Sequence, residues 1–233
     1  MADVINNRWV LDATFRGHYA ADTMEAATRL AHIAGGELDV RDEDIAALTA
    51  ALPYNDCLGV NTYKCQFLRA AEGENDINHN GTGDKGSVAL VPQGRGRVMR
   101  ARRRTHHRLG LDHLSRGLYD LLLRIKNDYP NYKKIYITEN GMGYKDDFED
   151  GFIDDAPRID YMRQHLAWIL KAIDGGVNVD GYFVWSLQDQ FSWTNGYNKR
   201  YGLFYIDFET QKRYPKASAY WYKNVAETGL LMA

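Results

Sequence analysis

Three short apolar runs, each ending in polar residues, constrain the fold of this chain most strongly. The runs cover residues 56–63, 134–141 and 179–187, and longer amphipathic segments separate them. Apolar runs of this length are typical of strands buried in a parallel sheet. Strands that alternate with helices build α/β folds, in which functional sites form at the carboxyl ends of the strands. We therefore expect an α/β protein whose functional residues follow these runs.

Amphipathic segments with clear stop signals lie before and between the predicted strands. Apolar residues recur at helical intervals in five segments, which are residues 23–34, 41–52, 117–129, 158–176 and 216–228. A hairpin is predicted through residues 202–208. Only three strand–helix units are visible, whereas a closed (β/α)8 barrel needs eight. We expect residues 1–233 to form a single domain that is part of such a barrel.

The composition excludes several classes of function. The chain has 29 basic and 31 acidic residues and a formal net charge of −2, which argues against nucleic-acid binding through overall positive charge. No apolar run approaches the ~18 residues of a membrane span, and the N-terminus lacks the features of a signal peptide. We therefore expect a globular cytoplasmic protein with neither a nucleic-acid partner nor a membrane partner.

Neither a cofactor nor a metal is predicted. Residues 81–86 fit a Gly-x-Gly-x-x-Gly pattern, but a strand-like run follows it, whereas a dinucleotide loop lies between a strand and a helix. His106, His107 and His113 have no companion Cys or acidic ligands at metal spacing. The acidic residues within 146–155 lack the pattern of a calcium loop, and we expect them to be solvated.

Glu139 is the strongest candidate for a catalytic residue. It follows a predicted buried strand and precedes a glycine-containing loop, so its side chain is expected to be held rigidly at the mouth of the sheet. An ionised carboxylate in this place can attack an anomeric carbon and form a glycosyl-enzyme intermediate. A glutamate that caps a helix or pairs with a loop arginine would fit the same spacing, and the residues alone leave both interpretations open.

Three segments in order resemble the family 1 β-glycosidases. They are Leu-Gly-Val-Asn-Thr-Tyr at 58–63, Ile-Thr-Glu-Asn-Gly at 137–141 and Gly-Tyr-Phe-Val-Trp-Ser-Leu-Gln-Asp at 181–189. The resemblance extends from about Asn7 to the C-terminus. It implies the C-terminal portion of a (β/α)8 TIM barrel, strands 6 to 8 with their helices, and it implies that Glu139 is the nucleophile of a retaining glycosidase.

The same resemblance implies roles for three further residues. Asn61 and Tyr63 fall on positions that reach towards the nucleophile and the sugar, and Trp185 matches a tryptophan that contacts the sugar. A tyrosine hydroxyl that donates a hydrogen bond to a carboxylate keeps it ionised and aligned. Without the resemblance, Asn61 and Tyr63 would be interpreted as ordinary polar residues at a strand end and Trp185 as a core residue.

Residues 192–211 resemble a loop of the branch of this family that acts on 6-phospho-β-galactosides. The resemblance implies that Ser192, Lys199 and Tyr201 bind the 6-phosphate, and that Trp193 marks galactoside selectivity. A dianionic phosphate needs a cation and several directed donors, which a lysine and two hydroxyls supply. The implied partner is a phosphorylated disaccharide such as lactose 6-phosphate. The alternatives are a 6-phospho-β-glucosidase and, for Lys199 and Arg200 without the resemblance, a solvated cationic loop.

Two parts of the family pattern are missing. Residues 95–108 include seven arginines in fourteen positions, and such a cluster could attract phosphates. The whole atypical segment, residues 95–116, lacks the expected family sequence, which suggests a local reading-frame error. Retaining hydrolysis needs a second carboxyl group ~5 Å from the nucleophile, and nothing before Trp9 could supply it. We therefore expect a truncated enzyme completed by a missing N-terminal half of the barrel. The alternative is an inactive fragment that retains weak affinity for sugar phosphates.

Overall fold

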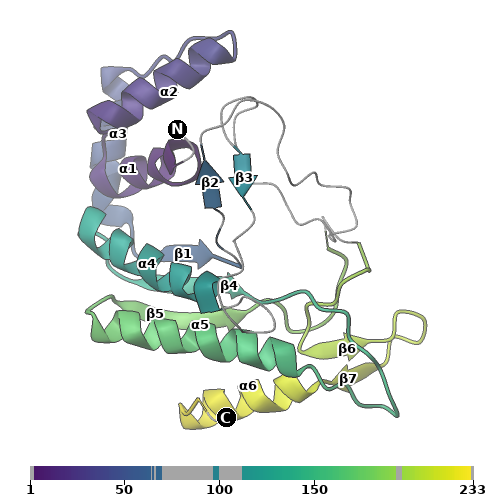
Figure 1. The fold of residues 1–233 in the computed structure, drawn as a ribbon. Coiled ribbons are helices and arrows are strands. Elements are labelled where there is room, and N and C mark those ends of the chain that lie inside the picture. Colours follow the sequence, from purple (N-terminus) through teal and green to yellow (C-terminus); the bar gives the residue numbers. More distant parts are fainter. Residues whose placement is uncertain are drawn as a thin grey trace.

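A three-stranded parallel sheet lies at the centre of the fold. The structure is a computed structural model, and it describes residues 3–63, 65, 67–69, 97–99, 112–192 and 196–231. The strand order is β1 (Leu58–Asn61), β4 (Ile135–Asn140) and β5 (Val179–Val184), and both neighbouring pairs are parallel (Figure 1). All three predicted strands form, and they lie side by side as a parallel α/β sheet requires.

Two long helices, α4 (Asp112–Asp128) and α5 (Ala156–Asp174), cover one face of the sheet (Figure 1). Successive side chains on a strand point to opposite faces, so Ile135 and Ile137 of β4 share the face that packs on the helices. Both are fully buried. The core of this layer consists of Leu118, Leu122, Ile125, Ile135, Ile137, Ile169, Ala172 and Val177.

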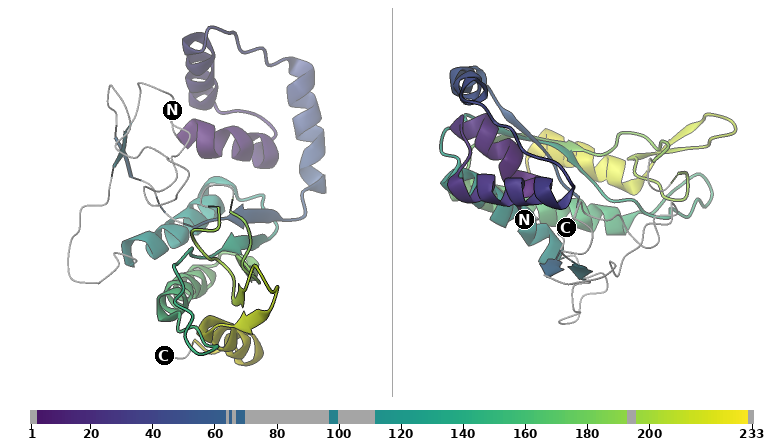
Figure 2. Two further views of the ribbon diagram at one scale, coloured as in Figure 1. Left: turned by 90° about the vertical axis from the view of Figure 1, so that its right-hand side faces the viewer. Right: turned by 90° about the horizontal axis from the view of Figure 1, so that it is seen from above.

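The N-terminal region forms a group of helices at the β1 end of the sheet (Figure 2). Its elements are a π-helical turn (Val4–Arg8), α1 (Trp9–Arg16), α2 (Ala21–Ile33), α3 (Asp42–Ala51) and a 3-10 turn (Leu52–Tyr54). The buried carboxylate of Asp12 accepts hydrogen bonds from the hydroxyls of Thr23 and Tyr129, at 2.7 and 2.9 Å. Because Tyr129 follows α4, Asp12 ties the N-terminal helices to the layer that covers the sheet.

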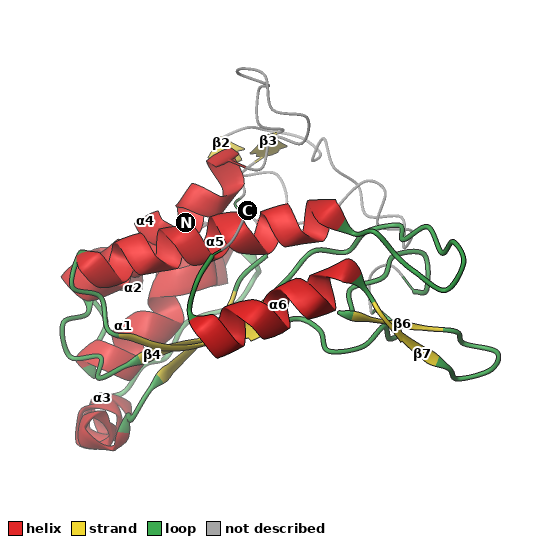
Figure 3. Cartoon of the chain, turned by 90° about the horizontal axis from the view of Figure 1, so that it is seen from below, coloured by secondary structure: helices red, strands yellow, loops and turns green. Residues whose placement is uncertain are grey.

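A hairpin and a helix lie on the β5 side of the sheet. Strands β6 (Phe204–Ile206) and β7 (Arg213–Pro215) pair antiparallel, and α6 (Ala217–Thr228) packs against α5 (Figure 3). The predicted hairpin and terminal helix are therefore confirmed. A separate antiparallel pair, β2 (Phe67–Arg69) and β3 (Arg97–Met99), is not part of the main sheet.

Two expectations were wrong. The helix predicted to begin at residue 117 begins at Asp112. The acidic residues expected to be solvated include Asp146 and Asp155, whose side chains are fully buried as partners of Arg158. A buried carboxylate requires a cation beside it, and packing of the loop against α5 supplies that cation.

Most of the arginine-rich segment, residues 95–116, lies outside the described residues, which include only β3 and the start of α4 from it. Residues 81–86, His106 and His107 also lie outside. Within the part of the chain that the structure describes, no helix is both long and apolar enough to cross a membrane. The same part contains no cluster of three or more His, Cys, Asp or Glu residues that could hold a metal ion.

Candidate active site

Glu139 lies at the carboxyl end of β4, directly beside Asn61 of β1. The hydroxyl of Tyr63, which follows β1, donates a hydrogen bond to Oε2 of Glu139. The backbone amide of Thr62 donates to the carbonyl oxygen of Glu139 at 2.9 Å. Burial, reinforced by the hydrogen bond to Glu139, raises the pKa of Tyr63 above its ordinary value, so this hydroxyl stays protonated as a donor at neutral pH. One short segment therefore fixes both the backbone and the side chain of Glu139.

Asn140, which the sequence did not single out, holds this segment in place. Its buried Nδ2 donates to the carbonyl oxygen of Thr62 at 2.7 Å and to the hydroxyl of Tyr161 at 3.0 Å. Tyr161 in turn donates to the carbonyl oxygen of Tyr63 at 2.7 Å. The hydroxyl of Tyr182 donates to Oδ1 of Asn140 at 2.8 Å. Asn140 therefore uses both polar atoms of its amide, and it joins all three strands behind Glu139.

The other two predicted residues at the strand ends, Asn61 and Trp185, bind the residues on either side of Glu139. Asn61 accepts a hydrogen bond from Oγ1 of Thr138 at 2.6 Å, so its amide is bound to the residue that precedes Glu139. The backbone amide of Trp185 donates to the carbonyl oxygen of Asn140 at 2.9 Å. A Cβ atom at Gly141 would lie 1.8 Å from the carbonyl oxygen of Trp185, so only glycine allows this close approach.

The loop predicted to bind phosphate packs against the loop that follows Glu139. The backbone amides of Tyr144 and Arg200 each donate to the other residue's carbonyl oxygen, both at 2.9 Å. The ring of Tyr201 lies so close to Gly143 that a Cβ atom there would be 2.5 Å from it. Tyr201 also contributes to the raised pKa of Tyr63. The structure therefore places Tyr201 against the loop that follows Glu139.

Ser192 and Lys199 lie on either side of the tip of this same loop. The backbone of Ser192 pairs with that of Gly196, with N–O distances of 3.0 and 2.8 Å, and this pairing closes the loop. Lys199 is half-buried and precedes the residue that pairs with Tyr144. Trp193 lies outside the described residues. The arrangement holds a carboxylate and a loop with a cation and two hydroxyls at the same end of the sheet.

Comparison with known proteins gives one family for nearly the whole chain. A model described as glycosyl hydrolase family 1 matches residues 1–230. A curated 6-phospho-beta-galactosidase from Leptotrichia buccalis is 55% identical over 228 residues, which is 97% of this chain and 48% of that protein. The chain therefore spans about half the length of this relative.

Solved structures agree with this match. A family 1 β-glucosidase from Thermotoga maritima superposes with a TM-score of 0.73 at 30% identity, over 98% of this chain and 45% of that one. A β-glucosidase from Exiguobacterium marinum gives a TM-score of 0.73 at 33% identity, over 98% and 46% of the two chains. The three-stranded sheet and its helices thus correspond to part of a larger barrel.

Proposed function

The chain belongs to glycosyl hydrolase family 1, and from that premise we propose that it carries the nucleophile and the phosphate-binding loop of a retaining 6-phospho-β-galactosidase. The proposal assigns β1, β4 and β5 to strands 6, 7 and 8 of the barrel. Its substrate class is 6-phospho-β-galactosides such as lactose 6-phosphate. The products would be galactose 6-phosphate and the released sugar or alcohol.

The hydrogen bond from Tyr63 to Glu139 carries the proposal. A nucleophilic carboxylate must stay in line with the anomeric carbon, and a donor that remains protonated on one oxygen leaves the other oxygen available for attack. Asn140 fixes the segment that supplies this donor. A glutamate that served only to cap a helix or to pair with an arginine would need neither contact.

Hydrolysis would proceed in two steps. An oxygen of Glu139 would attack the anomeric carbon as the bond to the leaving oxygen breaks, and a general acid would protonate that oxygen. The general acid is the second carboxyl group, which is left as a carboxylate after this step. It would then take a proton from water, and the water oxygen would attack the anomeric carbon and release Glu139. The proposal places this second carboxyl group on the part of the barrel that the present sequence does not span.

The phosphate would be bound by Ser192, Lys199 and Tyr201. A lysine supplies a cation and the two hydroxyls supply directed donors, which together suit a dianionic group. A hexose 6-phosphate would have to reach both this loop and Glu139, so the distance between them must be fixed. The close packing of Tyr201 on Gly143, in the loop that follows Glu139, supports such a fixed distance. The name of the Leptotrichia buccalis relative supports the same substrate class.

A chimera tests the proposal. This chain replaces the matching 48% of the Leptotrichia buccalis protein, and turnover is measured on nitrophenyl 6-phospho-β-galactoside, 6-phospho-β-glucoside and unphosphorylated β-galactoside. We expect the first substrate to give the highest kcat/KM. Preference for the glucoside would identify a 6-phospho-β-glucosidase instead. A chimera that folds but is inactive on all three, while this chain still binds galactose 6-phosphate, would identify a binding remnant.

A further inference from the structure

The geometry points to Arg200 as the residue that positions the phosphate-binding loop, although its own charge is committed to a buried ion-pair network. This inference rests on the proposed function and deepens it, because Arg200 lies between Lys199 and Tyr201. The sequence places two neighbouring cations, Lys199 and Arg200, in this loop, and the resemblance assigns phosphate binding to Lys199. The structure assigns them different roles.

The guanidinium of Arg200 is held by an acid and by aromatic rings. Its Nη1 donates to Oδ2 of Asp189 and to the carbonyl oxygen of Ile206, both at 2.8 Å. The guanidinium carbon lies 3.9 Å from the ring centre of Tyr205 and 4.7 Å from that of Phe208. Close approach to aromatic rings together with directed hydrogen bonds suits an arginine better than a lysine.

The network behind Arg200 is buried and balanced in charge. Asp189 also pairs with Lys216 at 2.8 Å, and Lys216 in turn pairs with Asp146. Arg158 pairs with Asp146 at 3.0 Å and also pairs with Asp155. Three cations therefore offset three carboxylates. Such groups require one another inside a protein, because removing any one leaves an uncompensated buried charge.

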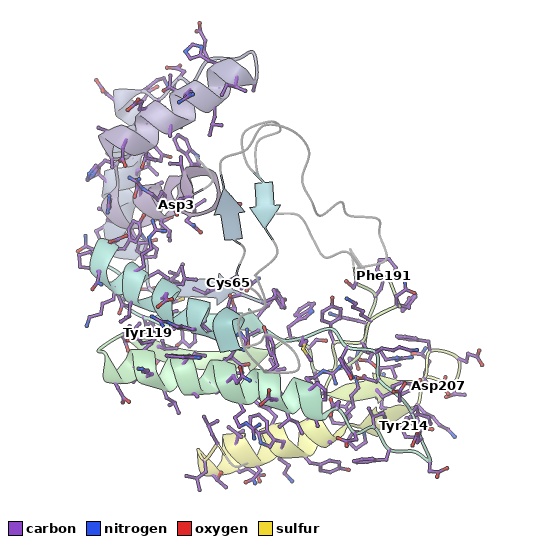
Figure 4. All side chains as sticks on the ribbon, viewed as in Figure 1. Asp3, Cys65, Tyr119, Phe191, Asp207 and Tyr214 are labelled. Carbon is purple, nitrogen blue, oxygen red and sulfur yellow. The ribbon has the colours of Figure 1, made fainter. Side chains whose placement is uncertain are left out.

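The network fixes the backbone as well as the side chain of Arg200. Nη2 of Arg158 donates to the carbonyl oxygen of Arg200 at 2.9 Å, and the Tyr144 amide donates to the same oxygen. Asp189 accepts from the amide of Gly202 at 2.9 Å, which fixes the chain just beyond Tyr201. Backbone restraints on both sides of Tyr201 hold it in one place. Figure 4 shows Asp207 and Tyr214 of the hairpin at the same end of the molecule as Phe191 of the loop.

Arg200 therefore acts on phosphate indirectly. Its charge is neutralised by Asp189, so Lys199 supplies the cation for the ligand while Arg200 sets where Lys199 and Tyr201 stand. A positioning role predicts a selective effect. Loosening Arg200 should weaken the contact with phosphate and leave contacts with the sugar ring unchanged, since the segment that holds Glu139 is fixed separately by Asn140.

The test uses the full chain and calorimetric titration with galactose 6-phosphate and with galactose. The variants are Arg200→Gln, Arg200→Lys and a matched control, Arg213→Gln, which removes an exposed arginine from the hairpin that follows this loop. We expect Arg200→Gln to weaken binding of galactose 6-phosphate roughly 10- to 100-fold and Arg200→Lys to weaken it less, with galactose binding unchanged. The control should bind both ligands as the original chain does.

The failures of the two proposals are distinguishable. If the original chain shows no preference for galactose 6-phosphate over galactose, the assignment of phosphate binding to this loop is wrong, and so is the role of Arg200. If the preference exists and Arg200→Lys and Arg200→Gln both retain it, only the positioning role is wrong. Equal weakening of both ligands in either variant would assign Arg200 a general structural role and would also overturn the inference. Near-ultraviolet circular dichroism checks that each variant keeps its tertiary packing.

Discussion

The hydroxyl of Tyr63 donates a hydrogen bond to the carboxylate of Glu139, although the two residues are 76 positions apart in the sequence. Parallel strands cannot be joined by a tight turn, so neighbouring strand ends come from distant parts of a chain. The contact therefore depends on the register in which β1 and β4 pair, where Asn61 stands opposite Glu139. The hydrogen bond on which the proposed chemistry depends is therefore set by the topology of the sheet.

Removing the hydroxyl of Tyr63 should slow catalysis in the chimera. A hydrogen bond to a charged group contributes about 1.5–3 kcal/mol, so Tyr63→Phe should lower kcat/KM on the phosphorylated galactoside by roughly 10- to 100-fold. The control is Tyr54→Phe, because Tyr54 is 82% exposed and lies outside the site. Steady-state kinetics measure both, and a loss of less than twofold for Tyr63→Phe would show that this donor does not align Glu139.

Truncating Asn140 should destabilise the fold. Asn140→Ala leaves the carbonyl oxygen of Thr62 and the hydroxyl of Tyr182 without their partner, and each buried group left unsatisfied costs about 1–3 kcal/mol. Urea unfolding should therefore show a loss of roughly 2–5 kcal/mol. Asn178→Ala is the control, since exposed Asn178 donates to the carbonyl oxygen of Lys133 where water can replace it. Similar losses for the two variants would contradict the role of Asn140.

Acid should destabilise the protein through His165. Burial lowers the pKa of His165 from 6.5 to about 4, and its Nδ1 is 2.8 Å from the carbonyl oxygen of Tyr161. The unfolded chain binds more protons than the folded chain between these two pKa values, so the free energy of unfolding falls as pH falls from about 6.5 to about 4. The expected loss is about 3 kcal/mol.

Unfolding curves between pH 4 and 7 measure this effect by comparing the protein with His165→Gln. The variant should lose that part of the pH dependence, whereas His32→Gln, which replaces an exposed histidine, should keep it. If the pH dependence of His165→Gln matched that of the original chain, titration of His165 would not be its cause.

Adding a methyl group at Gly143 should disturb phosphate recognition. The new Cβ atom would lie 2.5 Å from the ring of Tyr201, so the ring must move. Gly143→Ala should therefore reduce the preference of the chimera for phosphorylated over unphosphorylated galactoside by roughly tenfold. Gly36→Ala is the control, because the nearest atom, the carbonyl oxygen of Ala31, would be 3.9 Å from the new Cβ atom. If the ratio of the two kcat/KM values were unchanged, Tyr201 would have no role in phosphate binding.

The fold was predictable because its strands carry local signals. The apolar runs before Asn61 and Glu139 end in polar residues at the point where the parallel strands end. That pattern depends on residues close together in the sequence. The predicted start of α4 at Gly117 is wrong because the family pattern is absent ahead of Gly117, whereas the helix extends back to Asp112.

The supporting residues of the site were less predictable than the site itself. The position of Glu139 at a strand end identifies it as a candidate, the resemblance adds Tyr63, and the contact between them follows from the pairing of β1 with β4. The role of Tyr161 was not predictable from the sequence, because an aromatic residue on the apolar face of a helix looks like a core residue. Only the structure shows that its hydroxyl donates to the carbonyl oxygen of Tyr63. The burial of Asp146 is not predictable for a similar reason, since its partners lie at residues 158 and 216.

Covalent trapping tests the central role of Glu139 most directly. The chimera is incubated with a 2-deoxy-2-fluoro-β-galactoside 6-phosphate that carries a dinitrophenolate leaving group. The fluorine slows both chemical steps, and the leaving group departs without a general acid, so a glycosyl ester should accumulate. Peptide mass spectrometry should find one adduct per chain, on Glu139, and none in Glu139→Gln. An adduct on another residue, or undiminished turnover by Glu139→Gln, would contradict the account.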